Sequence, residues 1–156
     1  MRFQAFILYM LVSVFVTVAA GAQDLTIFGN EGSKVYDIED LATTFPVKTI
    51  ETVSTWTGED IVSYKGISLS ALLDANDLSS ETVEISAENG YASKIPEEMI
   101  EKYQPIIAFE ANGTALDFAS RGPLSVIWPR SDHPQELGET IDGMWTWYVT
   151  EIRAIN

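Results

Sequence analysis

The sequence contains no cysteine and only one histidine, His133, among its 156 residues. Without cysteine, the chain cannot form a disulfide, use a thiol nucleophile, or hold zinc, an iron–sulfur cluster or any other metal through a thiolate. With one histidine, it cannot build a histidine-rich metal site, and a catalytic triad would depend on His133. Basic residues are also few, because 9 Lys and Arg face 23 Asp and Glu, which gives a net charge of −14. Binding phosphates requires Lys and Arg, so this balance argues against nucleic acid and anionic membrane surfaces as partners.

The longest apolar run lies near the start of the chain. Arg2 precedes residues 5–20, which carry no charge, and the small residues Gly21 and Ala22 follow. This order is typical of a secretory signal peptide and predicts cleavage after Ala22. The alternative is an uncleaved membrane anchor, but 16 residues fall short of the ~20 needed to span a bilayer.

Cleavage at that point defines the expected organisation. We expect a signal peptide at residues 1–22 and one mature domain at residues 23–156, with a net charge of −15. A body of this length can bury a real core. We expect a periplasmic or secreted location and no membrane attachment after cleavage.

The rest of the chain consists of short alternating segments separated by turn residues. Asn89-Gly90 and Asn112-Gly113 supply the positive φ angles of tight hairpins, and Pro96 with two following glutamates favours the start of a helix. Strands are expected at residues 25–28, 47–55, 82–87, 91–95, 106–111, 124–128 and 145–152, and short helices at 38–42, 67–75 and 96–100. This pattern predicts an α+β domain with mixed or antiparallel β-sheets and a few short helices. No dinucleotide-binding glycine motif and no phosphate-binding loop occurs, which disfavours a doubly wound nucleotide fold.

Generic catalytic constellations are weak in this sequence. His133 lies in a polar loop and no G-x-S-x-G elbow is present, so we interpret it as a surface or pocket-rim residue rather than a general base. Glu97, Glu98 and Glu101 form an acidic helix face, which favours a solvated surface over paired-carboxylate catalysis or calcium binding.

Several segments taken in order are more informative. They are residues 52–58, 64–73, 87–96, 107–113 and 122–129, followed by Trp145. Together they resemble the molybdopterin-binding domain of the sulfite oxidase family, in particular its small, exported, single-domain members, over about residues 50–152. The resemblance implies that domain's fold. It also implies that the loops around Trp56, residues 89–91, residues 129–133 and Trp145 line one pocket, the family's cofactor cleft.

The chain departs from the family pattern where the cofactor would be held. The resemblance places Thr52 where family enzymes ligate molybdenum through a cysteine, and a hydroxyl is a hard, normally protonated substitute for a thiolate. Ser125 stands where an arginine tends to grip the pterin's phosphate, and Met144 stands where a lysine often precedes the late tryptophan. Arg121 and Arg130 remain near the cleft, each as an anion ligand or as an ordinary surface or salt-bridged residue.

These departures favour one function and leave an alternative. The favoured function is an exported module, without molybdenum catalysis or a resident cofactor, that binds a small-molecule ligand or an envelope protein partner through the former cofactor cleft. The alternative is a genuine molybdopterin-dependent oxidoreductase with a non-thiolate ligand at Thr52 or Ser54 and with Arg121 or Arg130 on the phosphate.

A third hypothesis is a purely structural or interaction domain that packs exposed aromatics against a partner. Alternation places Trp145 and Trp147 on one strand face, which favours core over interface. No residue is assigned a catalytic or metal-ligating role. The candidate cleft residues are Thr52, Ser54, Trp56, Asn89, Tyr91, Arg121, Arg130, His133 and Trp145.

Overall fold

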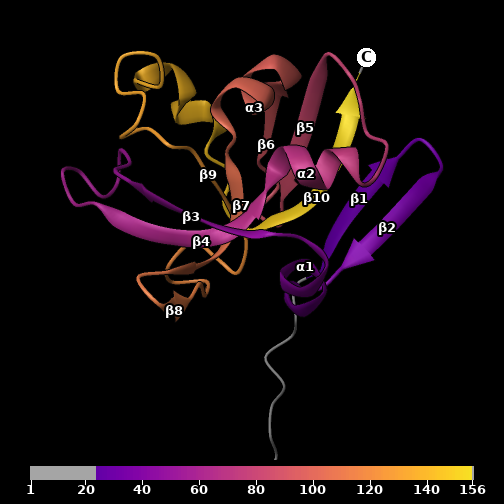
Figure 1. The fold of residues 1–156 in the computed structure, drawn as a ribbon, viewed down its shortest axis with the longest axis horizontal. Coiled ribbons are helices and arrows are strands. Elements are labelled where there is room, and N and C mark those ends of the chain that lie inside the picture. The colour runs from indigo at the N-terminus through magenta and orange to yellow at the C-terminus, as the bar shows by residue number, and fades with distance from the viewer. Residues whose placement is uncertain (1–23, 156) are drawn as a thin grey trace, which may run out of the picture.

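The computed structural model describes residues 24–155, which form two β-sheets accompanied by three short α-helices (Figure 1). The α+β class predicted from the sequence is confirmed. The predicted signal peptide, residues 1–22, lies outside the described residues. Within the described part of the chain, no helix is both long and apolar enough to cross a bilayer.

The first sheet is mixed. Its strand order is β2-β1-β10-β5-β6. The bounds are β1 Leu25–Gly29, β2 Gly32–Tyr36, β5 Thr82–Ala87, β6 Ala92–Pro96 and β10 Val149–Ile155. β1 runs parallel to β10, with Thr26 opposite Glu151, whereas the other neighbours are antiparallel. β10 therefore joins two hairpins into one sheet.

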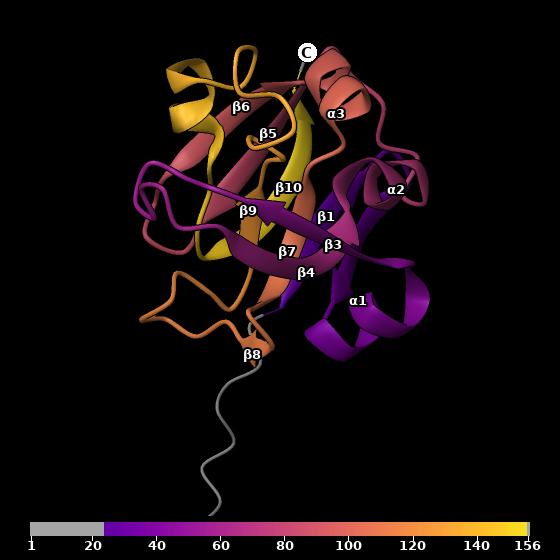
Figure 2. The ribbon, with the colours of Figure 1, turned by 60° about the vertical axis from the view of Figure 1, so that its left-hand side comes forward.

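The second sheet is antiparallel and crosses in front of the first (Figure 2). Its strands are β3 Val47–Thr52, β4 Val62–Ser68, β7 Ile106–Ala111, β8 Thr114–Ala115 and β9 Ser125–Ile127. β7 pairs with β4, β8 and β9. At the register shift between β4 and β7, a Cβ on Gly66 would overlap the backbone of Ile107 and Ala108. Glycine is required there because the two strands approach closely, and not because the chain turns.

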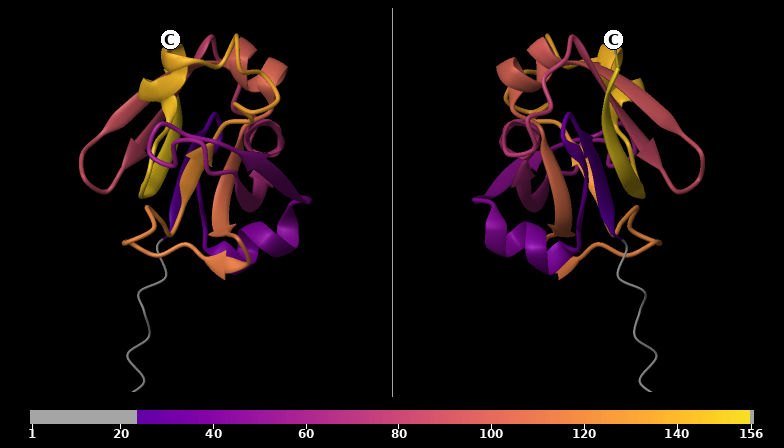
Figure 3. Two further views of the ribbon diagram at one scale, coloured as in Figure 1. Left: turned by 90° about the vertical axis from the view of Figure 1, so that its left-hand side faces the viewer. Right: turned by 90° about the vertical axis from the view of Figure 1, so that its right-hand side faces the viewer.

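The helices follow the local signals in the sequence. α1 (Ile38–Thr44) begins at Asp37, whose carboxylate accepts a bond from the Asp40 amide at 2.7 Å, the usual N-cap arrangement. α2 is Leu69–Asp74 and α3 is Glu97–Tyr103. α1 and α3 lie at opposite ends of the molecule (Figure 3). The sequence prediction placed Pro96 inside α3, whereas it is the residue before the first turn.

One apolar core is shared by both sheets. β9 is buried throughout, pairs with β7, and forms a bridge from Ser125 to Trp147. Trp128 follows it, is 0% exposed, and donates from its indole N–H to the Met144 carbonyl at 3.1 Å. The core therefore fixes the chain on both sides of the 3₁₀ helix η1 (Glu139–Met144).

Sequence patterns missed some elements and extended others. β2, β4, β8 and η1 were not predicted. The last strand was expected to begin at Trp145 but begins at Val149, because Tyr148 has a φ of 57° and breaks the extended run. β3 ends at Thr52 instead of Thr55. Both corrections fall in segments that shape the candidate site.

Candidate functional site

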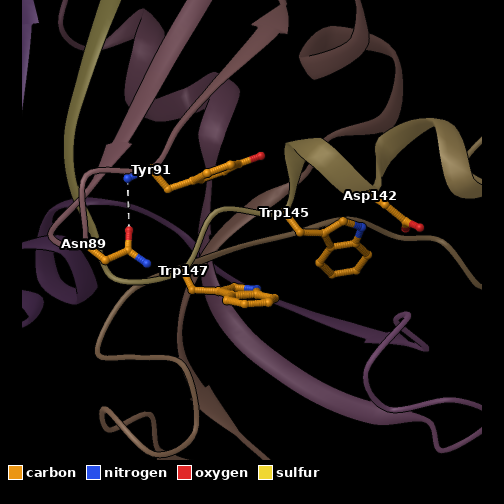
Figure 4. Close-up of a pocket in the computed structure, with 5 residues that line it drawn as sticks. All are labelled: Asn89, Tyr91, Asp142, Trp145 and Trp147. Atoms are coloured by element: carbon orange, nitrogen blue, oxygen red, sulfur yellow. Dashed lines mark hydrogen bonds between the residues drawn. The ribbon is translucent and has the colours of Figure 1, made fainter.

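The candidate residues gather where loops from both sheets meet. Trp56 lies in the β3–β4 loop, and Asn89 and Tyr91 lie in the β5–β6 turn. Trp145 and Trp147 lie in the irregular segment between η1 and β10. Figure 4 shows the last four of these residues together with Asp142 of η1. The site is thus built from loops that the two sheets hold in place.

Three tryptophans, Trp56, Trp145 and Trp147, form what we call the tryptophan cluster. The Trp56 ring meets the Trp145 ring at 4.9 Å and 88° and the Trp147 ring at 4.8 Å and 82°, centroid to centroid. Edge-to-face pairs of this kind contribute ~0.5–1.5 kcal/mol each beyond the area they bury. The cluster therefore fixes the β3–β4 loop against the segment before β10.

Arg121 covers this cluster. Its guanidinium carbon lies 4.9 Å from the Trp147 centroid and 5.3 Å from the Trp56 centroid, which are cation–π contacts. Tyr64 of β4 lies beneath Trp56. Burial raises the pKa of the Tyr64 hydroxyl, although a hydrogen bond with Trp56 and the charge of Arg121 act in the opposite direction. Arg121 is thus engaged by aromatic rings rather than presented freely to an anion.

Arg130 is engaged by an ion pair. Its Nη1 lies 3.1 Å from Oδ1 of Asp142 and 3.2 Å from Oγ1 of Thr55, and Thr55 donates to the same Oδ1 at 2.7 Å. The Arg130 side chain is 18% exposed and that of Asp142 is 35% exposed. Of the two roles expected for Arg130, an anion ligand or a salt-bridged residue, the structure shows the salt bridge.

A pocket of about 290 Å³ opens beside the tryptophan cluster. We call it the aromatic pocket, and it is lined by Asn89, Tyr91, Asp142, Trp145 and Trp147 (Figure 4). Tyr91 is 43% exposed, and its hydroxyl donates to the Gly143 carbonyl at 2.6 Å. The Asn89 side-chain oxygen accepts from the Tyr91 amide at 3.1 Å. The Tyr91–Gly143 bond ties the β5–β6 turn to η1, and the Asn89–Tyr91 bond lies within the turn itself.

The hydroxyls of Thr52 and Ser54 are used inside the fold. Thr52 is 0% exposed; its Oγ1 donates to the Val53 carbonyl and accepts from the Ser131 amide, both at 3.2 Å. The Val53 amide returns a bond to Ser131 Oγ at 3.0 Å. Ser54 is 3% exposed and exchanges hydrogen bonds with Thr57 within its own turn. Both residues hold the β3–β4 loop in place, and neither lines the aromatic pocket.

His133 lies apart from the other candidates. Its ring meets the Tyr103 ring edge-on at 5.1 Å, and it lines a different depression that includes Lys48 and Lys102. The single pocket implied by the family resemblance therefore includes Asn89, Tyr91 and Trp145, with Trp56, Arg121 and Arg130 packed around it, but not His133. Three residues that line the aromatic pocket or support its surroundings were not among the candidate cleft residues: Tyr64, Asp142 and Trp147. Only Trp147 carried a signal, its alternation with Trp145.

The residues present do not fit a thiolate-ligated, phosphate-bearing cofactor. The position expected for the ligating cysteine is the buried, hydrogen-bonded Thr52. Ser125, at the position expected for an arginine, is 2% exposed and donates to the Arg121 carbonyl. Residues 24–155 contain no group of three or more His, Cys, Asp or Glu side chains placed to hold a metal. A pocket of about 290 Å³ is also at the lower limit for a drug-sized ligand.

Comparison with known proteins supports the fold. No family model matches the chain, and no curated protein matches it by sequence. Among solved structures, the chain is similar to the sulfane dehydrogenase SoxCD from Paracoccus pantotrophus, with a TM-score of 0.61 and 20% identity over 83% of this chain. The match covers 37% of that protein's chain, so this chain spans little more than a third of its length. The likeness confirms the α+β fold predicted from the sequence, which is similar to the fold of the sulfite oxidase molybdopterin-binding domain.

Proposed function

We propose that the chain is an exported binding module that keeps the molybdopterin-domain fold without molybdenum catalysis, and that it binds a small ligand through the aromatic pocket. The observation that carries the proposal is the state of Thr52. Its hydroxyl is fully buried and bonded to Val53 and Ser131, so the position that would ligate the metal faces the protein interior.

The two arginines support the same conclusion. Arg121 lies over Trp56 and Trp147, and Arg130 is paired with Asp142. An anionic cofactor could gain Arg130 only by breaking its pair with Asp142, and the chain as a whole has a net charge of −14. A small ligand in the aromatic pocket does not require that change.

The absence of cysteine gives a direct test of the Thr52 position. A Thr52→Cys variant would carry the only thiol in the chain, and Ser33→Cys, on the exposed strand β2, provides the matched control. We expect iodoacetamide to label the Thr52→Cys protein at least ~100-fold more slowly than the Ser33→Cys protein under native conditions, because labelling a buried thiol requires local opening. Both should react equally in urea. Equal labelling rates of the two variants under native conditions would show that position 52 is accessible, and would refute the proposal.

A second experiment tests the function itself. The protein, expressed with its leader in a host that makes molybdenum cofactor, should contain far less than one equivalent of molybdenum by elemental analysis. Native mass spectrometry of the same sample should show the protein alone or with a small ligand, and an N-terminus at Gln23 would support export and cleavage. Stoichiometric molybdenum with a pterin mass would instead establish the alternative, an oxidoreductase with a non-thiolate ligand.

A further inference from the structure

The walls of the aromatic pocket are ring faces. In Figure 4 the rings of Tyr91 and Trp147 are both seen nearly edge-on, one above the other, with Trp145 beside the space between them. Asn89 closes the opposite end. A group that enters this space therefore meets the π-faces of at least two rings.

The indole N–H groups are not available to a ligand. Nε1 of Trp145 and Nε1 of Trp147 are buried and have no hydrogen-bond partner within residues 24–155. Both rings stand perpendicular to Trp56 at less than 5 Å between centroids, the arrangement in which a ring edge meets a π-cloud. Neither indole can therefore supply a donor that a buried anion requires, which leaves the neutral amide of Asn89 as the donor among the lining side chains.

The formal charges nearest the pocket are the carboxylate of Asp142, which is paired with Arg130, and the guanidinium of Arg121, which lies over Trp147. None of the five lining residues is basic, and one of them, Asp142, is a carboxylate. The bonds from Arg130 and Thr55 both fall on its Oδ1 rather than Oδ2. The same cluster already holds one cation, since Arg121 lies over Trp56 and Trp147. The net charge of −14 also attracts cations to the protein from a distance.

We propose that the aromatic pocket binds the methylated ammonium group of a small organic cation. The proposal rests on the proposed function, that this pocket is a ligand site, and adds the chemical class of the ligand. Quaternary ammonium groups are recognised by aromatic faces because the ring quadrupole attracts the charge while the methyl groups fill apolar space. A volume of about 290 Å³ suits such a head group better than a drug-sized ligand.

Isothermal titration of the purified exported protein tests this class with three probes. Choline carries the charge, 3,3-dimethylbutan-1-ol has the same shape without charge, and nicotinamide is flat and neutral. We expect choline to bind at least ~10-fold more tightly than its uncharged counterpart, which corresponds to ~1.4 kcal/mol, because cation–π attraction strengthens when the rings are desolvated. Equal affinities for choline and the alcohol, or tighter binding of nicotinamide, would overturn the cationic class.

Matched variants locate the binding. Tyr91→Leu should weaken choline binding by ~5–30-fold, and Tyr91→Phe, which keeps the ring, by less than ~3-fold. Asp142→Asn should weaken the binding of choline more than the binding of the alcohol, because only choline carries a charge. Phe118→Leu, an exposed aromatic outside the pocket at 69% exposure, should change neither. If Tyr91→Leu and Phe118→Leu have equal effects, the site is not this pocket.

The two proposals can fail separately. If choline does not bind, the cationic class is wrong. Native mass spectrometry of the protein from its own host then decides the proposed function, because it detects a bound small molecule of any class. If the protein carries a neutral or anionic ligand, the proposed function as a binding module is supported and only the cationic class is wrong.

Discussion

Replacing Trp56 by alanine should destabilise the protein by about 3 kcal/mol. Its two edge-to-face contacts with Trp145 and Trp147 contribute ~0.5–1.5 kcal/mol each, and its cation–π contact with Arg121 contributes ~0.5–2 kcal/mol. These contributions sum to ~2–5 kcal/mol, in agreement with the ~3–5 kcal/mol typical of large aromatic truncations. Trp56 is half-buried, which places the expectation in the lower part of that range.

Urea denaturation followed by circular dichroism measures this loss. The midpoint should fall by ~1–3 M with an unchanged slope, because the slope depends on the surface exposed on unfolding. Phe118→Ala is the control, since Phe118 only stacks on Tyr148 at 4.4 Å and is 69% exposed, and it should cost less than ~1 kcal/mol. In a double-mutant cycle, Trp56→Ala and Trp147→Ala should couple by ~0.5–1.5 kcal/mol. A loss for Trp56→Ala no larger than that for Phe118→Ala would refute the idea that the cluster holds the loop.

Three further predictions concern single residues near the site. In a spectrophotometric titration, one tyrosine should ionise above the ordinary pKa of 10.0, and Tyr64→Phe should remove it. Because this pKa is raised in the folded state, the contribution of Tyr64 to stability is present below pH 10 and is lost as the pH rises through the raised value. Thr52→Val should lower the free energy of unfolding in urea by ~1–2 kcal/mol, since the amide of the half-buried Ser131 loses its acceptor. If it costs nothing, Thr52 does not hold the loop. Gly66→Ala should cost more than ~2 kcal/mol, because the added carbon overlaps the neighbouring strand, and a thermal melt near that of the natural chain would contradict this.

Local signals in the sequence predicted most of the elements. The two Asn-Gly pairs turn the hairpins β5–β6 and β7–β8, and α1 ends at Thr44, with Phe45 as its C-cap immediately before Pro46. These features depend on turn and cap chemistry carried by adjacent residues. The sulfite-oxidase-like fold was predicted from the order of the sequence motifs, and the structural similarity to SoxCD supports that prediction.

Other features could not be predicted because distant contacts decide them. Gly66 lies inside β4, where the approach of β7 requires glycine, and no neighbouring residue in the sequence signals that approach. The last strand was extended through Tyr148, whose positive φ is imposed by its surroundings. β2 is almost wholly exposed and lacks an apolar face, so it has no periodic signal.

The candidate site shows the same division. The sequence motifs predicted that Tyr91 and Trp145 line one pocket, and the structure places both there. They failed for His133, because tight turns at Asp132 and His133 direct that ring toward Tyr103 on α3. Asp142 had no signal of its own, since nothing in an acidic chain distinguishes one carboxylate from the others before the fold places it beside Arg130.

The position of β10 has a consequence for the timing of folding. β10 is the last strand, yet it lies between β1, the first strand, and β5, and it pairs Thr26 with Glu151. Until β10 has been synthesised, the first sheet exists only as two separate hairpins, which are marginal by themselves. Contacts of such long sequence separation slow folding. The first sheet can therefore close only after β10, the last of the described strands, has been made, whereas the second sheet does not need β10.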